Sequence, residues 1–266
     1  HKELDSLFFH DERLQLRYND LRNSISNESP KSSYTCFQDA LKNDRIDFFF
    51  LGDFNEVEIT ESLKSLPFTA RKGDVTIQYH QSYSNVLQEG MVQRNVGQSI
   101  LEMGYHSPVK YGDDEHLPML VMNGLLGEFA HSKLFANVRE NAGIAYTVSS
   151  QLDLFSGLLR MYAGIDRENR NRARKMMNHQ LLDLKKGNFT DFELEQTKEM
   201  IRRSLLMAQD NQQTLVERAY LNALLGKSSF DMDRLVAKLE SVDKEAVCKA
   251  ANSLKLQAIY FMEGVE

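Results

Sequence analysis

The chain has 266 residues, of which 42% are hydrophobic and 26% are charged. These proportions are close to globular averages and exclude a disordered or fibrous chain. The net charge of −6 argues against a nucleic-acid-binding protein, because duplex binding normally needs a basic surface. Two cysteines, Cys36 and Cys248, are too few for a disulfide framework and are typical of a reducing compartment.

The sequence also indicates whether the chain enters a membrane and whether it is part of a longer polypeptide. No apolar stretch approaches the roughly 20 residues that a membrane-spanning helix needs. The first residues carry charges among their apolar side chains and contain no signal-peptide hydrophobic region. We therefore expect a cytoplasmic protein with no membrane partner. Because the chain begins with His1 rather than Met, we also expect it to be a piece of a longer polypeptide.

The first 70 residues predict helices around one strand. Apolar residues recur at helical spacing over 3–25, and a polar stretch containing Pro30 predicts a loop over 23–33. The apolar run Ile46–Leu51, followed by Gly52, is typical of a buried strand, with short helices before and after it. One strand cannot close a sheet. We therefore expect residues 1–70 to be the C-terminal remainder of a first α/β lobe.

Residues 71–266 predict a complete second lobe, in which most strands precede a block of helices. The expected strands are 74–82, 94–105, 144–152, 157–165 and 257–262. The expected helices are 115–126, 132–141, a helix capped by Asp166, 190–207, 215–225, 231–239 and 244–254. Strands followed by helices indicate an α+β fold, with a mainly antiparallel sheet and helices packed on one face.

Two of these helices carry further signals. Thr190, with Glu193 three residues on, forms the capping-box pattern at the start of the helix over 190–207. The basic run Arg167–His179 has two interpretations, a nucleic-acid or anion patch and the solvent face of an amphipathic helix. We favour the solvent face, because Ala173, Met177 and other apolar residues define the opposite face and the chain is acidic overall.

The sequence contains no recognisable linear metal or nucleophile motif. A zinc-peptidase helix needs two histidines four residues apart with a glutamate beside them, and none of the seven histidines meets that spacing. Gly-x-Ser-x-Gly and both glycine-rich phosphate-binding patterns are absent. We therefore expect no metal ligands and no catalytic residues in this chain.

The segment Leu125–Ser150 carries the most specific pattern. It contains Ser132, Leu134 and Phe135, then Val138, Arg139 and Glu140, then Gly143, Ala145 and Tyr146. This order resembles the second-half motif of the insulinase/pitrilysin family of zinc peptidases, which includes the mitochondrial processing peptidases. Residues 49–53 and 98–105 extend the resemblance, which covers the chain from about residue 45 onward. The match in detail is similar to bacterial members, several of which lack the zinc motif. One departure is the bend before the motif, where Gly127 is the single glycine.

The resemblance implies a two-lobed protein whose zinc motif, if retained, lies in the first lobe, outside this chain. Arg139 and Tyr146 would then project from the second lobe towards a bound peptide. A guanidinium can bind a peptide carbonyl or carboxylate, and a phenol can stabilise an oxyanion. Taken alone, Arg139 could form a surface ion pair with Glu140, and Tyr146 could pack in a strand. The joint spacing favours a substrate-binding origin.

The sequence thus predicts the C-terminal, substrate-binding half of an insulinase-like zinc metallopeptidase or of its inactive paralogue. The chain alone is expected to bind extended peptides and to hydrolyse nothing. Its expected partners are a peptide or protein substrate, the N-terminal lobe of the same polypeptide and a homologous subunit. The alternative is a non-catalytic scaffold or partner subunit of an active peptidase. Nucleic-acid binding through Arg167–Lys175 is a third, remote possibility.

Overall fold

The structure is a computed structural model that describes residues 2–15, 24–68, 79–226 and 231–265. The chain divides into two compact units. The first unit contains residues 1–17, 78–205 and 231–266, and the second contains residues 18–77 and 206–230. Each unit is described by itself.

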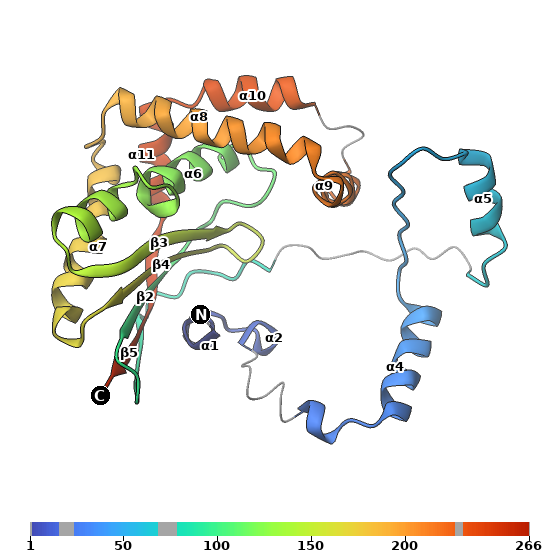
Figure 1. Cartoon of the computed structure of the whole chain (residues 1–266), viewed down its shortest axis with the longest axis horizontal. Coiled ribbons are helices and arrows are strands. Elements are labelled where there is room, and N and C mark those ends of the chain that lie inside the picture. Colours follow the sequence, from blue (N-terminus) through green and yellow to red (C-terminus); the bar gives the residue numbers. More distant parts are fainter. Residues whose placement is uncertain (1, 16–23, 69–78, 227–230, 266) are drawn as a thin grey trace. The chain divides into compact units, whose positions relative to one another are not determined.

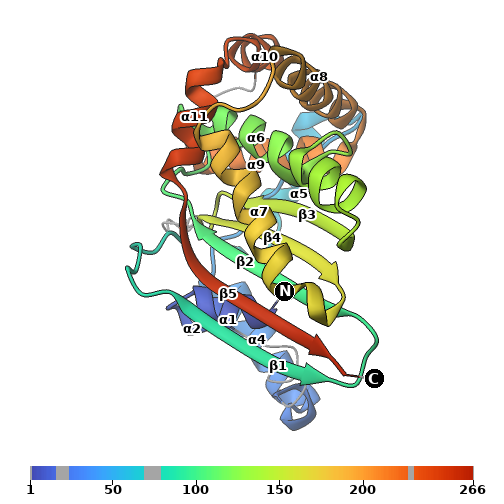
Figure 2. The same ribbon diagram turned by 90° about the vertical axis from the view of Figure 1, so that its left-hand side faces the viewer.

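The first unit is built on a five-stranded sheet with the strand order β1-β5-β2-β4-β3 (Figure 2). The strands are β1 (Gln88–Arg94), β2 (Ser99–His106), β3 (Ala145–Asp153), β4 (Leu158–Ile165) and β5 (Lys255–Gly264). The pairs β2–β4, β2–β5 and β3–β4 are antiparallel, while β1 runs parallel to β5. The sheet is therefore mainly antiparallel, and β3 and β1 are its edge strands.

Helices cover one face of this sheet (Figure 1). They are α6 (His116–Asn123), α7 (Arg170–Lys185), α8 (Asp191–Met207), α10 (Met232–Glu240) and α11 (Lys244–Ser253). Alternate sheet residues such as Met103, Met161 and Phe261 point into the core that these helices close. The alternation follows from the two-residue repeat of a strand, which sends neighbouring side chains to opposite faces. The predicted α+β fold class is confirmed.

A short N-terminal helix packs on the other face of the sheet. Helix α1 (Lys2–Phe8) contacts β5, β1 and β2, and α2 (Glu12–Gln15) follows it. Leu4 and Phe8 are fully buried there, in a second apolar cluster that includes Ala258 and Tyr260. The helix predicted over residues 3–25 is thus divided into shorter pieces, and residues 16–23 lie outside the described residues.

The second unit contains α4 (Pro30–Asn43), α5 (Glu56–Lys64) and α9 (Gln212–Leu224). The loop prediction over 23–33 is largely wrong, because residues 24–27 are helical and Pro30 is the first residue of α4, where its missing N–H costs nothing. The strand prediction at Ile46–Leu51 is also wrong. In the described part of the chain these residues pair with no strand, although Phe49 makes an edge-to-face contact with Tyr220.

The first strands also differ from the prediction, and the strand expected over 94–105 is confirmed only from Ser99 on, as β2. Of the strand expected over 74–82, residues 74–78 lie outside the described residues and 79–82 have no regular structure. The chain instead forms β1 at Gln88–Arg94, a largely exposed edge strand with few apolar residues. Its pairing with β5 is parallel and spans more than 150 residues of sequence, so no local pattern marks it.

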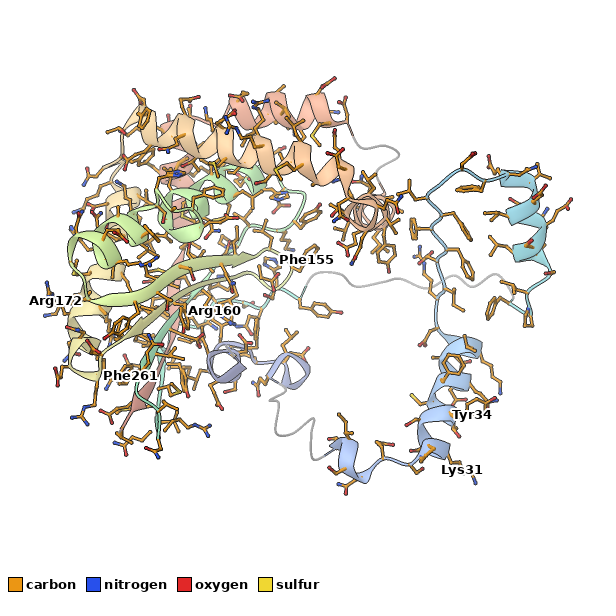
Figure 3. All side chains as sticks on the ribbon, viewed as in Figure 1. Lys31, Tyr34, Phe155, Arg160, Arg172 and Phe261 are labelled. Carbon is orange, nitrogen blue, oxygen red and sulfur yellow. The ribbon has the colours of Figure 1, made fainter. Side chains whose placement is uncertain are left out.

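The basic run lies on α7 as the amphipathic interpretation predicts. Ala173, Met177 and Leu181 are buried. Around this run, the guanidinium of Arg170 lies 4.7 Å from the centre of the Phe261 ring, and Arg174 forms an ion pair of 3.0 Å with Glu89. Arg172 points outward at the edge of the unit (Figure 3). No helix in the described ranges is long and apolar enough to cross a lipid bilayer.

Candidate functional site at the η2–β3 corner

The motif segment folds as two short π-helices followed by an edge strand. Helix α6 continues into the π-helix η1 (Gly124–Glu128), and a second π-helix, η2 (Phe135–Asn141), precedes β3. Ser132, Leu134 and Val138 are buried under the helical layer. These side chains fix the position of η2, while Arg139 at its end is exposed.

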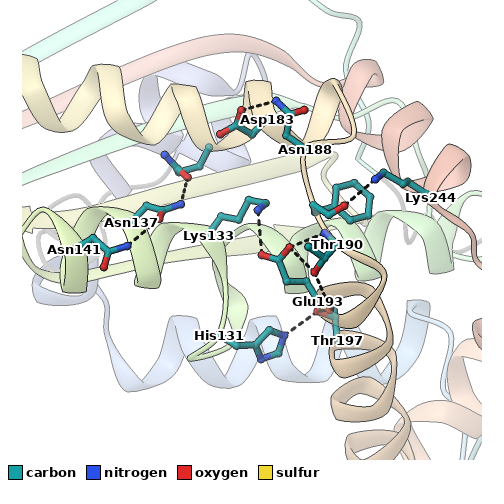
Figure 4. A network of polar contacts seen from close by, with 12 residues as sticks. His131, Lys133, Asn137, Asn141, Asp183, Asn188, Thr190, Glu193, Thr197 and Lys244 are labelled. Atoms are coloured by element: carbon teal, nitrogen blue, oxygen red, sulfur yellow. Dashed lines mark hydrogen bonds and ion pairs between the residues drawn. The ribbon is translucent and has the colours of Figure 1, made fainter.

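A polar network fastens this segment to α8 (Figure 4). Lys133 forms an ion pair with Glu193 at 3.1 Å. Glu193 also accepts a hydrogen bond from the Thr190 backbone N–H at 2.7 Å, while its own N–H donates to the Thr190 hydroxyl at 3.1 Å, so the predicted capping box is confirmed. Burial alone would raise the pKa of Glu193, but the bonds from Thr190 and Lys133 outweigh it and hold that pKa below its usual value.

His131 belongs to the same network. Its Nε2 lies 2.8 Å from the Thr197 hydroxyl. The Thr197 hydroxyl donates its hydrogen to the Glu193 carbonyl at 2.8 Å. The hydrogen in the bond between His131 and Thr197 must therefore be on Nε2 of His131. Burial lowers the pKa of His131, with Glu193 acting in the opposite direction. The histidine is therefore a neutral structural donor.

Two glycines shape the backbone on either side of this network. Gly143 has φ +62°, and its N–H donates to the Arg139 carbonyl at 3.1 Å, so it ends the helix in the left-handed conformation. Gly127 lies against β3, where a Cβ would stand 2.6 Å from the Ser150 nitrogen. Gly127, the single glycine of the bend, is therefore required by the close approach of η1 to β3.

Arg139 stands at the exposed end of η2. Its guanidinium lies 4.7 Å from the centre of the Phe135 ring, and its Nε is 3.7 Å from Glu140. Its side chain is 43% exposed, so the pair with Glu140 is a loose surface contact. The stacking on Phe135 orients the guanidinium and leaves donors that can reach another molecule.

Tyr146 is the second residue of β3 and is 58% exposed. Its hydroxyl donates to the Asp166 carboxylate at 2.9 Å, and that bond raises the pKa of the phenol. The phenol therefore stays protonated at neutral pH, and its single O–H can donate to another molecule only when the bond to Asp166 opens. With most of its surface exposed, Tyr146 is not a core residue of the strand.

The sequence assigned Asp166 to helix capping, and that assignment is wrong. Among the described residues it makes no side-chain capping bond, and its carboxylate holds Tyr146 instead. Asp166 is thus a site residue that sequence reasoning missed. The pairing of Ala145 with Ile165 across β3 and β4 brings Tyr146 near Asp166, and only the sheet register could have revealed it.

A cavity of about 650 Å³ lies further along β3. Its lining includes Ser150, Gln151, Glu128 and Arg160 from the sheet and η1, and Asp5 from α1. Asn123 donates to Glu128 at 3.0 Å and accepts from Ser150 at 2.7 Å, so these three residues form a chain of hydrogen bonds. Burial raises the pKa of Glu128, and Asn123 partly opposes this shift.

The arrangement offers donors rather than a metal cage. In the described part of the chain, no group of three or more His, Cys, Asp or Glu side chains is placed to hold a metal ion. The residues that the structure describes therefore include no ligand set that fits zinc. What η2 and β3 supply is a guanidinium, a neutral phenol and the backbone of an edge strand, which suit an extended peptide.

Comparison with known families identifies the family of this chain. The model of the peptidase M16 inactive domain matches residues 28–201, a range that includes both Arg139 and Tyr146. The chain belongs to the peptidase M16 family. The resemblance to zinc peptidases that the motif indicated is thereby confirmed, and the matched domain is the inactive one.

Relatives in bacteria agree with this assignment. The chain is 30% identical over 234 residues to the "probable inactive metalloprotease YmfF" of Bacillus subtilis, covering 88% of this chain and 55% of the relative. It is 28% identical over 164 residues to the "uncharacterized zinc protease YmxG" of the same organism, covering 61% and 40%. The chain thus spans about half the length of the curated relatives it matches.

Solved structures share the fold of this M16 chain. A conserved protein from Enterococcus faecalis has a TM-score of 0.95 and 34% identity, over 99% of this chain and 63% of that one. A protease from Helicobacter pylori has a TM-score of 0.66 and 18% identity, over 80% and 53%. The second similarity supports the fold alone.

Proposed function

We propose that this M16 domain binds extended peptides through Arg139 and Tyr146, as the C-terminal, substrate-binding half of a larger peptidase-like protein. The observation that carries the proposal is the placement of an exposed guanidinium and an exposed, protonated phenol on two adjoining elements, η2 and β3, joined by the Gly143 turn. Arg139 would bind a peptide carbonyl or carboxylate, and Tyr146 would turn its single O–H away from Asp166 to donate to a carbonyl oxygen.

The same proposal covers the parent protein. Residues 1–70 would be the remainder of a first lobe, of which α1 packs on the sheet of the second lobe, and residues 71–266 would be that second lobe. Zinc, where the parent is active, would be held by the first lobe. Exposed apolar side chains support this division, because Phe48, Phe50 and Phe54 are each more than 40% exposed. Within the described residues, α4 and α5 bury no side chain fully, as expected of elements that lack their packing partner.

A non-catalytic scaffold is the second candidate. It is supported by the name of the Bacillus subtilis relative, a "probable inactive metalloprotease". In that case this domain would complement an active partner subunit without touching its substrate. Arg139→Ala and Tyr146→Phe would then leave the activity of the partner unchanged. A drop of about 10²-fold, the scale for losing one oxyanion donor, would instead favour the substrate-binding role.

Peptide titrations test the proposal on the purified 266-residue chain. Fluorescent extended peptides are titrated into the wild type and into Arg139→Ala and Tyr146→Phe, with binding followed by anisotropy. Each substitution is expected to weaken binding by roughly tenfold, which corresponds to about 1.4 kcal/mol. Arg172→Ala on α7 and Tyr34→Phe on α4 are matched exposed controls. Equal affinities for all five proteins, or no binding by the wild type, would overturn the proposal.

A further inference from the structure

The sheet face opposite the main helical layer contains a groove that fits one helix. Gly90 of β1 and Gly104 of β2 lie on this face, together with Ala258 of β5. A Cβ on Gly90 would lie 2.7 Å from Leu7, and a Cβ on Gly104 would lie 3.0 Å from Phe8. The missing side chains therefore provide the depth into which α1 packs.

Helix α1 fills this groove with one apolar stripe. Leu4 and Phe8, four residues apart, are fully buried, and Leu7 packs beside them. Residues at this spacing lie on the same side of a helix. Because a helix as short as α1 is not stable alone in water, its structure depends on the groove.

Polar contacts fix the direction and register of α1. The carbonyl of Phe8 accepts hydrogen bonds from Gln81 and from Gln257, the latter at 2.8 Å. Asp5 forms an ion pair with Arg160 of β4, which is labelled in Figure 3, and the two side chains are only 21% and 11% exposed. The groove thus selects two apolar side chains and one acidic side chain between them.

Helix α1 also lines one side of the cavity beside β3. Asp5 and Phe9 line that cavity together with Gln151 and Arg160. Without α1, the cavity would open onto the groove, and Arg160 would lose the carboxylate that neutralises it. Among the described residues, the Nε of Arg160 is already buried with no hydrogen-bond partner.

We propose that α1 is an internal cover on a helix-docking groove, and that an amphipathic helical peptide with the same side-chain order takes its place when α1 leaves. The order is a large apolar residue, an acidic residue next to it, and a second large apolar residue three positions after the acid, as in Leu4, Asp5 and Phe8. The groove shares no residue with the pair Arg139 and Tyr146. It is therefore a second binding surface that goes beyond the proposed function.

A labelled peptide with the sequence of residues 2–15 tests the groove directly on the full 266-residue chain. In the wild type, α1 competes from within the chain at a high effective concentration, so we expect weak binding. In the variant Leu4→Asp with Phe8→Asp, the peptide should bind at least about tenfold more tightly. Far-UV circular dichroism confirms that the variant retains its fold. A folded variant that binds no better than the wild type would overturn the proposal.

Charge exchange tests the selectivity of the groove. In the opened variant, Arg160→Asp should reduce peptide binding at least tenfold, and a peptide carrying Asp5→Arg should restore it. Arg172→Asp on α7 is the matched control and should change nothing. If Arg160→Asp has no effect, the pairing with Asp5 does not guide docking and the proposed selectivity is wrong. Neither result depends on Arg139 or Tyr146, whose own titrations decide the proposed function separately.

Hydrogen exchange of the wild type decides the matter if the opened variant does not fold. A releasable cover requires the amides of α1 to exchange at least about tenfold faster than those of β5, through local opening. If the amides of both elements exchange at one common rate, α1 opens only when the whole unit unfolds. That result would overturn the proposal.

Discussion

Within the motif segment, residues 131–146 are held in opposite ways at their two ends. At its start, Ser132 and Leu134 are buried, and His131 and Lys133 bond to α8. At its end, Arg139 and Tyr146 are exposed, and each touches one charged neighbour near the surface. A rigid start followed by exposed donors is what a binding site needs, because the anchors position side chains that themselves stabilise little. Substitutions at the start should therefore cost stability, and those at the end should cost binding.

Leu134→Ala should have the largest effect on stability. Leu134 is 0% exposed in the main core, and removing a fully buried leucine side chain typically costs about 2–5 kcal/mol. Urea unfolding followed by circular dichroism measures the loss. Leu182→Ala on α7, where the side chain is 38% exposed, is a control that should cost much less. Equal costs for the two variants would mean that the start of the motif is not anchored by packing.

Gly143→Ala should come next. Its φ of +62° costs most residues with a Cβ about 1–2 kcal/mol, although no described atom lies within 4 Å of the added Cβ. Gly143→Asn is the matched control and should cost less, because asparagine tolerates this conformation. Thermal or urea unfolding of both variants checks the order. If the alanine variant is as stable as the wild type, the turn between η2 and β3 does not need the left-handed conformation.

Glu193→Gln should cost about 1 kcal/mol at pH 7 by weakening the cap and the ion pair with Lys133. Because the pKa of Glu193 is lowered in the folded protein, its contribution is complete above about pH 4.5 and is lost as the pH falls through the folded-state pKa. The wild type and the variant should therefore converge in stability as the pH falls below the folded-state pKa of Glu193. Glu168→Gln, on the turn before α7, is the control. A difference that persists at low pH would contradict the assignment.

Tyr146→Phe should have the smallest effect on stability, within about 0.5 kcal/mol, because an exposed hydrogen bond to Asp166 exchanges readily with water. The same variant should show a large loss in peptide binding. Unfolding and binding measured on one preparation separate the two effects. A loss of 2 kcal/mol or more would make Tyr146 a structural residue and would remove the contrast between the two ends.

Local chemistry made a helix cap and a buried helix face predictable, whereas contacts between residues far apart in sequence could not be predicted. The capping-box pair Thr190 and Glu193 predicts the start of α8. The spacing of Ala173 and Met177 predicts the buried face of α7. By contrast, Ile46–Leu51 has the composition of a strand, but composition cannot supply a partner strand. Asp166 reads as a cap and instead holds Tyr146, because the register of β3 and β4 brings them together. The docking of Leu4 near Ala258 likewise depends on contacts far apart in sequence.

The central claim is that Arg139 and Tyr146 bind one peptide together, and a double-mutant cycle tests it most directly. Dissociation constants for an extended peptide are measured with the wild type, Arg139→Ala, Tyr146→Phe and the double variant. We predict that each single change weakens binding and that the two losses are coupled by at least about 0.5 kcal/mol, as for groups that share a partner. Affinities indistinguishable from the wild type, or from an Arg172→Ala and Tyr34→Phe control pair, would contradict the account.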